Sequence, residues 1–184
     1  FARNRADANE PPAYSEASHG FGVSRIPQAE LPRQQYGAYQ AAVLPPVNPD
    51  ELKITADDFA EFEHSLIAIQ QAWSKGDIAS LRRLVTPEML SYFSEQLADN
   101  ASQGVANIVT DVKLEQGDLA ESWGEGDVEY ATTALRFSSL DYDTSLDNGS
   151  VVRGSKDTRT TATESWTFVR HAGSGRWLLS AVQQ

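Results

Sequence analysis

The chain has 184 residues, which is enough for one domain and a tail at about 100 to 200 residues per domain. It contains no cysteine, which excludes disulfides, thiolate zinc sites and cysteine nucleophiles. The net charge is −11 at pH 7, and the acidic excess falls entirely in residues 50–184. Such an acidic domain is not expected to bind nucleic acid, because phosphate contacts need a basic surface.

Residues 1–50 carry seven of the eight prolines and keep no helical or strand period. This composition is typical of a linker or docking arm, extended where proline dictates. Residues 51–184 then form the predicted folded domain.

The first predicted helix begins near Thr55, which can cap it, and ends at Gly76. Two aspartates in its first turn suit the positive end of the helix dipole. Apolar residues recur at spacings of three and four, which predicts one buried stripe. The stripe consists of Phe59, Phe62, Leu66, Ile69 and Trp73.

Two more helices are predicted before the chain changes character. Asp77 caps a short one, and Thr86 with Pro87 opens a third that ends near Gly104, since Pro fits the first helical position. From Val105 onward the apolar period is two, as in strands. The expected strands cover 107–119, 126–142, 149–155, 157–171 and 175–184, with Asp147-Asn148-Gly149 suited to a hairpin turn.

Helices first and an antiparallel sheet afterwards predict an α+β fold, with three helices packed on a curved sheet. The sequence predicts no catalytic residue, metal site or cofactor, because the three histidines are scattered and no nucleotide or hydrolase motif is present. His64 is expected at the surface. Asp141, Asp143 and Asp147 resemble a calcium loop, but the required Gly and Glu are missing, and we interpret the segment as an acidic hairpin turn.

Glu164 leaves two interpretations open. It shares a strand face with Trp166, where an apolar pocket would raise the pKa of a carboxyl group and make it a base. The alternative, which we favour, is a cross-strand ion pair with Arg153 or Arg159.

Several motifs together resemble a known family. Residues 72–90 read AWSKGDIASLRRLVTPEML, residues 164–170 read ESWTFVR, and residues 176–184 read RWLLSAVQQ. In this order they are similar to the C-terminal domain of the mitochondrial inner-membrane import-motor anchor, the 44-kilodalton subunit of the inner-membrane translocase. The chain resembles a bacterial-type member of that family.

The resemblance implies a cone similar to nuclear transport factor two, in which the sheet and helices enclose an apolar cavity. It also implies a non-catalytic, membrane-associated scaffold that binds a protein partner in translocation or membrane-protein assembly, or a lipid tail, through that cavity. The family's charged chaperone-recruiting region is missing, which argues against Hsp70 recruitment. By amphipathic phase, the expected lining of this ligand pocket is Trp73, Tyr92, Phe93, Tyr130, Phe137, Trp166 and Phe168.

Bacterial relatives carry an N-terminal membrane anchor. Arg3 and Arg5 fit the cytoplasmic flank of a spanning helix, so we expect an anchor upstream of Phe1 and a location at the cytoplasmic face of a bacterial inner membrane. Two other functions remain open for the same fold. One is an isomerase, dehydratase or hydrolase with Glu164 as base and Tyr130 as its partner, and the other is a structural subunit of a cell-envelope assembly.

Overall fold

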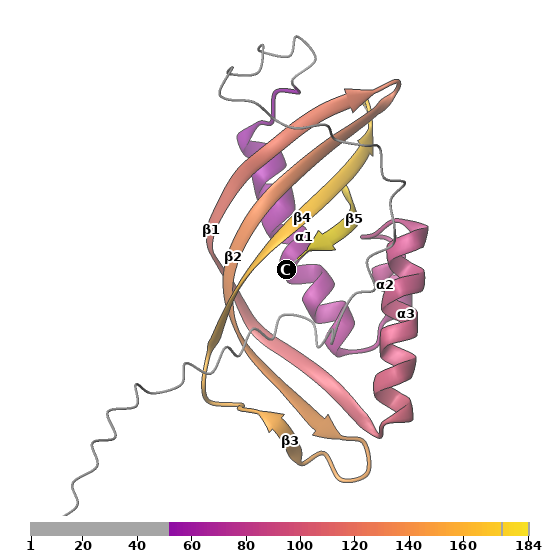
Figure 1. The fold of residues 1–184 in the computed structure, drawn as a ribbon, viewed down its shortest axis with the longest axis vertical. Coiled ribbons are helices and arrows are strands. Elements are labelled where there is room, and N and C mark those ends of the chain that lie inside the picture. The colour runs from indigo at the N-terminus through magenta and orange to yellow at the C-terminus, as the bar shows by residue number, and fades with distance from the viewer. Residues whose placement is uncertain (1–51, 174, 184) are drawn as a thin grey trace, which may run out of the picture.

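The computed structural model of the protein describes residues 52–173 and 175–183. The predicted arm, residues 1–50, lies outside the described residues. The predicted fold class is confirmed, because three helices precede a strongly curved antiparallel sheet and pack on its concave side (Figure 1). The convex side, on the left of Figure 1, carries no described helix.

Each helix begins at its predicted cap. The side chains of Thr55, Asp77 and Thr86 accept hydrogen bonds from Asp58 N–H, Ser80 N–H and Met89 N–H, respectively. Thr55 and Asp58 form a complete capping box, which satisfies two N–H groups at the start of the first helix. The helices are α1 (Ala56–Ser74), α2 (Ile78–Leu81) and α3 (Pro87–Ser102).

The sheet has the strand order β1-β2-β4-β5, and β3 pairs with the far end of β2. All pairings are antiparallel, as the short turns predicted. The first two strands are longer than expected, because they form one hairpin along nearly the whole length of the sheet (Figure 1). The strands are β1 (Val105–Glu125), β2 (Val128–Ser145), β3 (Val151–Gly154), β4 (Thr160–His171) and β5 (Leu178–Gln183).

Three register shifts in β1 accompany the curvature of the sheet. They lie between Thr110 and Lys113, Leu114 and Gln116, and Leu119 and Glu121. A bulge inserts an extra residue into one strand, which bends it and strengthens the twist. Arg159 holds the first bulge from two strands away.

The Arg159 guanidinium forms an ion pair with Asp111, which has a positive φ of 50°, and donates to the Asp111 carbonyl oxygen at 2.7 Å. The same guanidinium donates to Ser138 Oγ at 2.8 Å. Arg159 therefore links the start of β4 to β1 across β2.

Other parts of the chain cover the edges of the sheet. At the β1 edge, the Ser74 hydroxyl accepts the Val109 N–H at 2.8 Å and lies 2.9 Å from the Val109 carbonyl oxygen. At the β5 edge, Leu179 bonds to the segment before α3, since its N–H donates to the Leu84 carbonyl oxygen and its own carbonyl oxygen accepts the Thr86 N–H, each at 2.9 Å. These bonds satisfy backbone groups that an edge strand would otherwise expose.

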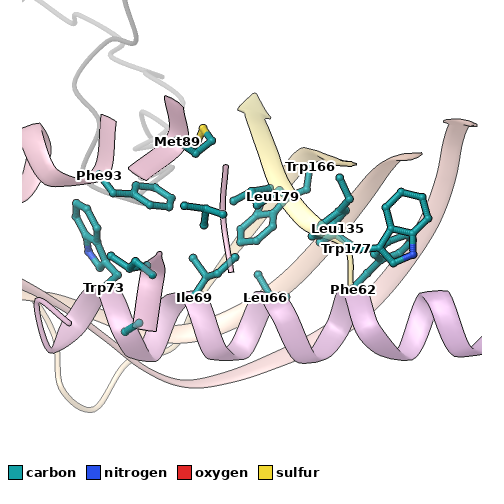
Figure 2. Packing of buried hydrophobic residues seen from close by; sticks show 14 of the residues in the cluster. Phe62, Leu66, Ile69, Trp73, Met89, Phe93, Leu135, Trp166, Trp177 and Leu179 are labelled. Carbon is teal, nitrogen blue, oxygen red and sulfur yellow. The ribbon is translucent and has the colours of Figure 1, made fainter. Parts of the chain in front are cut away.

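The core lies between α1 and the concave side of the sheet. Figure 2 shows the side chains of Phe62, Leu66, Ile69 and Trp73 projecting into it from one side of α1, as the stripe predicted. Phe62 stacks on Phe168, with ring centroids 4.5 Å apart. The largest fully buried side chains are Trp73, Trp166, Trp177, Phe62, Phe93, Phe137 and Phe168.

Only glycine fits at position 154, where β3 ends against β2. Gly154 has φ of +77°, and a Cβ atom there would lie 2.4 Å from the Asp141 carbonyl oxygen and 2.8 Å from Tyr142 Cα. Both the positive φ and the close backbone approach exclude larger residues. Gly154 thus allows β3 to stay paired with β2 up to its last residue.

Gln70 in α1 is completely buried, yet neither polar atom of its side-chain amide has a hydrogen-bond partner among the described residues. A buried polar group without a partner destabilises a protein by about 1 to 3 kcal/mol. We therefore expect Gln70→Met, which keeps the shape and removes the amide, to raise the free energy of unfolding by about 1 kcal/mol or more. Urea denaturation followed by circular dichroism measures this change.

The adjacent Gln71 is exposed and provides a matched control. Gln71→Met should leave the unfolding free energy within about 0.5 kcal/mol of the wild type. A Gln70→Met variant that is less stable than the wild type would mean that the amide is satisfied.

Candidate binding groove

An apolar groove lies where the C-terminal end of α1, the C-terminal half of α3 and the start of β1 meet. Its volume is about 460 Å³, and Trp73 and Ser74 from α1 form part of its wall. The exposed Leu146, which follows β2, lies at its border. The other apolar lining residues are Ile78, Leu97, Ala98, Ala101, Val105 and Ala106.

A buried hydrogen-bond network fixes the tryptophan in this wall. Trp73 Nε1 donates to Asn107 Oδ1 at 2.9 Å. The Asn107 amide nitrogen in turn donates to Asp141 Oδ1 at 2.8 Å and to Asp143 Oδ1 at 2.9 Å. Arg153 forms an ion pair with Asp143. The network therefore joins α1, β1, β2 and β3, and it holds the indole plane in one orientation.

A second, polar hollow of about 330 Å³ adjoins the groove and shares Asn100 and Val105 with it. Asp143 and Arg153 of the network line this hollow, and so does the exposed Val152. An apolar channel with a polar extension suits a ligand or peptide that has both kinds of group.

Asp141 and Asp143 correct one sequence-based interpretation. We expected an acidic hairpin turn, but both residues lie inside β2 and are 6% and 4% exposed. Their carboxylates face the concave side and accept hydrogen bonds from Asn107. Only Asp147 of that acidic group lies in the turn. Strand phase places the other two inside, where hydrogen bonds from Asn107 satisfy both carboxylates and Arg153 pairs with the charge of Asp143.

The structure separates the residues expected to line a cavity. Five of them, Trp73, Phe93, Phe137, Trp166 and Phe168, are at most 2% exposed and belong to the core cluster. Tyr92 packs against this cluster, and burial raises the pKa of its hydroxyl group, which has no hydrogen-bond partner among the described residues.

Tyr130 does not join the other predicted lining residues. It lies on the opposite, convex face of the sheet, where it stacks on Trp123 at 4.9 Å between ring centroids. Of the seven residues, Trp73 alone borders one of the two hollows described above. The sequence analysis did not assign the other groove residues to a binding site. The signal that could have indicated them is that Ala98 and Leu146 are apolar residues at exposed positions.

Glu164 does not make the expected cross-strand ion pair. Arg153 pairs with Asp143, and Arg159 pairs with Asp111. Glu164 is 2% exposed and accepts a hydrogen bond from Trp166 Nε1 at 2.8 Å. The two residues share a face of β4, as predicted, because their positions differ by two. An enzymatic pair of Glu164 with Tyr130 has no geometric basis, since Tyr130 lies on the other face of the sheet.

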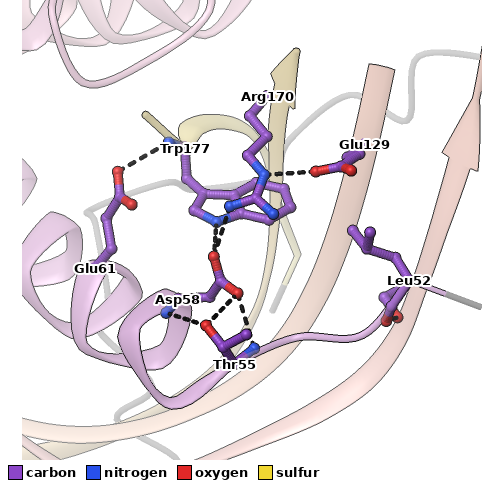
Figure 3. A network of polar contacts seen from close by, with 8 residues as sticks. Leu52, Thr55, Asp58, Glu61, Glu129, Arg170 and Trp177 are labelled. Carbon is purple, nitrogen blue, oxygen red and sulfur yellow. Dashed lines mark hydrogen bonds and ion pairs between the residues drawn. The ribbon is translucent and has the colours of Figure 1, made fainter. Parts of the chain in front are cut away.

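A second polar network closes the opposite end of the core, around the start of α1 (Figure 3). Asp58 Oδ1 accepts hydrogen bonds from Trp177 Nε1 at 2.8 Å and from Arg170 Nη1 at 2.6 Å. Arg170 also donates to Glu129 Oε2 at 2.6 Å, and its guanidinium lies 4.2 Å from the Trp177 ring centroid. The charged and polar side chains of this network therefore satisfy one another by hydrogen bonds, and the network connects α1 to the β4–β5 hairpin.

Charge and hydrogen bonding shift the pKa values in this network. Burial raises the pKa of Asp58, but hydrogen bonds from Trp177 and Thr55 and the charge of Arg170 lower it overall, from 3.8 to about 2. Burial lowers the pKa of Arg170, but Glu129 and Asp58 more than compensate and raise it. Both groups therefore stay charged at neutral pH and stabilise the fold.

Comparison with known proteins shows the family of this chain. The family model described as Tim44-like domain matches residues 40–184. The chain belongs to the Tim44-like domain family. The predicted resemblance is thereby confirmed, and the match begins before the first described residue. None of the curated proteins compared with this chain matches it in sequence.

Solved structures similar to this Tim44-like domain are distant. The intermembrane space region of the chloroplast protein ARC6 is 12% identical, with 72% of this chain and 97% of that chain covered and a TM-score of 0.45. An NTF2-like superfamily protein from Salmonella enterica serovar Typhimurium is 16% identical, with 67% and 87% covered and a TM-score of 0.39. A putative dehydratase of the NTF2-like family from Streptomyces avermitilis is 14% identical, with 71% and 100% covered and a TM-score of 0.32. These likenesses support no inference about what the Tim44-like domain binds or catalyses.

In the described part of the chain, no group of three or more His, Asp or Glu residues could hold a metal ion. No described helix combines the length and the apolar character needed to cross a bilayer.

The low pKa of Asp58 makes a testable contribution to stability. A carboxyl group with a depressed folded-state pKa stabilises the fold above its unfolded pKa, and this contribution is lost as the pH falls through the folded value. For Asp58 the window runs from pH 3.8 down to about pH 2. The Tim44-like domain should lose about 2 kcal/mol of unfolding free energy there through this group, as measured by urea denaturation at each pH.

Asp57 on the same helical turn is exposed and is the matched control. Asp58→Asn should be less stable than the wild type at pH 7 and lose less stability across that window, whereas Asp57→Asn should keep the wild-type pH profile. Equal profiles for Asp58→Asn and the wild type would refute the assignment.

Proposed function

We propose that this Tim44-like domain is a non-catalytic, membrane-associated scaffold that binds a protein partner through the groove at Trp73. The observation that carries this proposal is the apolar surface around the groove. Among the described residues four large apolar side chains are exposed, and three of them, Leu146, Val151 and Val152, lie on the β2–β3 hairpin that borders the two hollows. Exposed apolar patches with polar rims mark interaction sites.

The wall of the groove is suited to an apolar anchor from a partner. Trp73 is fixed by Asn107 and packs edge-on against Phe93, with ring centroids 5.7 Å apart. A wall that is already ordered binds at a lower entropic cost than one that must first be immobilised. The neighbouring polar hollow, with Asp143 and Arg153, offers hydrogen-bonding groups that would fix the orientation of the partner.

Membership of the family supports the membrane location. The family resemblance implies an anchored scaffold in translocation or membrane-protein assembly, and we propose the same setting here. The cytoplasmic face of a bacterial inner membrane, argued from Arg3 and Arg5, remains a prediction.

A lipid tail is the alternative occupant. An acyl chain is apolar throughout and would use only the groove residues such as Leu97 and Ala101, without the polar hollow. Entry into the predicted interior pocket would require Phe62, Phe93 and Phe168 to separate, because they are at most 1% exposed. The adjoining polar hollow therefore favours a peptide over a lipid.

Photo-crosslinking tests this proposal directly. Because the chain lacks cysteine, Ala98→Cys in the groove can be labelled uniquely with a benzophenone maleimide. After incubation with membranes from the source cells and illumination, we expect a discrete protein adduct, identified by mass spectrometry. Leu146→Ser at the border should reduce its yield about threefold or more, since an exposed leucine at an interface contributes on the order of 1 kcal/mol.

Ala172→Cys is the control, because Ala172 is exposed in the loop at the opposite end of the sheet. It should give no adduct of that mass. A phospholipid adduct at Ala98→Cys instead of a protein would favour the lipid tail. Equal labelling patterns at the two positions would contradict a binding role for the groove.

A further inference from the structure

An apolar strip crosses one end of the convex face of the sheet. Figure 1 shows no described helix on this side of β1, β2 and β4. Tyr130 on β2 lies directly opposite Trp123 on β1 and Val169 on β4. Val169 in turn lies opposite Leu178 on β5. All four side chains are partly exposed, and none is among the residues that pack against the core cluster. The apolar strip formed by these four residues is therefore not part of the core.

The strip is ordered and includes the one accessible tryptophan of the chain. Trp123 and Tyr130 stack with ring centroids 4.9 Å apart and planes 8° from parallel. The other three tryptophans, Trp73, Trp166 and Trp177, are at most 2% exposed. Exposed apolar groups with aromatic members mark interaction sites. Because the strip is narrow and lies on a curved face, a single extended segment fits it better than another folded domain.

The chain enters the domain beside this strip. The Ser122 hydroxyl donates to the carbonyl oxygen of Leu52, the first described residue, at 2.7 Å. Ser122 directly precedes Trp123, and β1 is an outer strand of the sheet. The chain upstream of Leu52 therefore has only the edge of β1 to pass before it reaches the strip.

The sequence directly upstream has the composition of an apolar ligand. Residues 43–47 read VLPPV, and residues 48–50 read NPD, which is typical of a turn. The family model matches from residue 40 onward, so it includes this apolar segment although the segment precedes the first described residue. The family match thus treats residues 43–47 as part of the domain and not as a spacer before it.

The lengths of the segment and of the strip agree. Val47 is five residues before Leu52, so the connection between them spans at most about 17 Å. The strip crosses four neighbouring strands, which at about 4.8 Å per strand spacing gives a length of about 14 Å. Five residues in a polyproline conformation extend over about 12 Å. Residues 43–47 can therefore reach the strip and cover most of it.

The chemistry of the two surfaces also agrees. Consecutive prolines restrict a segment before it binds, so little entropy is lost, and such segments dock on surfaces lined by aromatic side chains. Leu44 and Val47 add apolar side chains on either side of the two prolines. A short connection gives an effective concentration in about the millimolar range, so even a weak contact is largely formed within one chain.

We propose that residues 43–47 of this chain bind across the apolar strip, with Val47 beside Trp123 and Val43 toward Leu178. This contact goes beyond the proposed function, because it uses a different surface. The strip includes Trp123 near the end of β1, whereas the groove lies at the start of β1. The chain upstream of residue 43 would then leave the domain at the end opposite the groove, and whatever it is attached to would not obstruct the groove.

Quenching of tryptophan fluorescence by acrylamide tests the proposal on the full chain, because Trp123 is the accessible tryptophan. The double variant Leu44→Ser and Val47→Ser should release the segment and raise the quenching constant about twofold or more, since the indole regains contact with solvent. Circular dichroism should show an unchanged fold, because the strip lies outside the core cluster. In a Trp123→Phe background the same double variant should leave the quenching constant unchanged.

The matched control is the double variant Val23→Ser and Leu31→Ser, which makes the same kinds of change upstream of the family match. It should quench as the wild type does. Equal quenching constants for the wild type and the Leu44→Ser and Val47→Ser variant would overturn the proposal, and so would an equal rise in both double variants. Wild-type quenching that decreases as the protein concentration rises from about 1 to 50 µM would also overturn it, because another molecule would then cover the strip.

Discussion

The concave side of a strongly curved sheet must be filled, and α1 fills it. Its buried stripe runs from Phe62 to Trp73 and meets the large side chains of β4 and β5, as in the stacking of Phe62 on Phe168. Buried apolar side chains of this size each stabilise the fold by about 1.5 to 3 kcal/mol relative to exposure. The position of α1 in turn sets both polar networks, because Asp58 lies at one end of the helix and Trp73 at the other.

The two ends of α1 have different chemical tasks. At the start, Asp58 joins the helix to Arg170 and Trp177 by charge-assisted hydrogen bonds, which are stronger than neutral ones. At the end, Trp73 combines burial against Phe93 with one hydrogen bond and lies in the wall of the groove. The start of α1 thus closes one end of the core, and the end of α1 contributes to the wall of the candidate binding groove.

Local patterns in the sequence predicted the helices well, because caps and apolar spacing act within a few residues. Thr55, Asp77 and Thr86 were all recognisable from their own neighbourhoods. Glu164 and Trp166 were predicted on one face of their strand, and the hydrogen bond between them agrees. Tyr130 and Phe137 were assigned to one lining, although they lie seven residues apart on the same strand, and strand alternation places such residues on opposite faces. Tyr130 was therefore grouped with side chains that lie on the opposite side of the sheet.

Contacts between distant residues were beyond prediction from one sequence. Arg153 and Arg159 were expected near Glu164, but register shifts in β1 and the separate pairing of β3 bring them to Asp143 and Asp111. The buried position of Asn107 depends on residues 34 and 36 positions away. The groove was missed for the same reason, since its wall combines three helices, a strand and the residue after β2.

The covered edge of β1 has a further consequence. Ser74 occupies the backbone N–H and lies against the carbonyl oxygen of Val109, and three bulges interrupt the regular spacing beyond it. A strand from another molecule could not pair regularly with this edge. The backbone groups of Val109 are already hydrogen-bonded, and the bulges make the spacing of the remaining backbone groups irregular. This edge of the sheet therefore disfavours lateral addition of another strand, as expected for a protein that avoids aggregation through its longest strand.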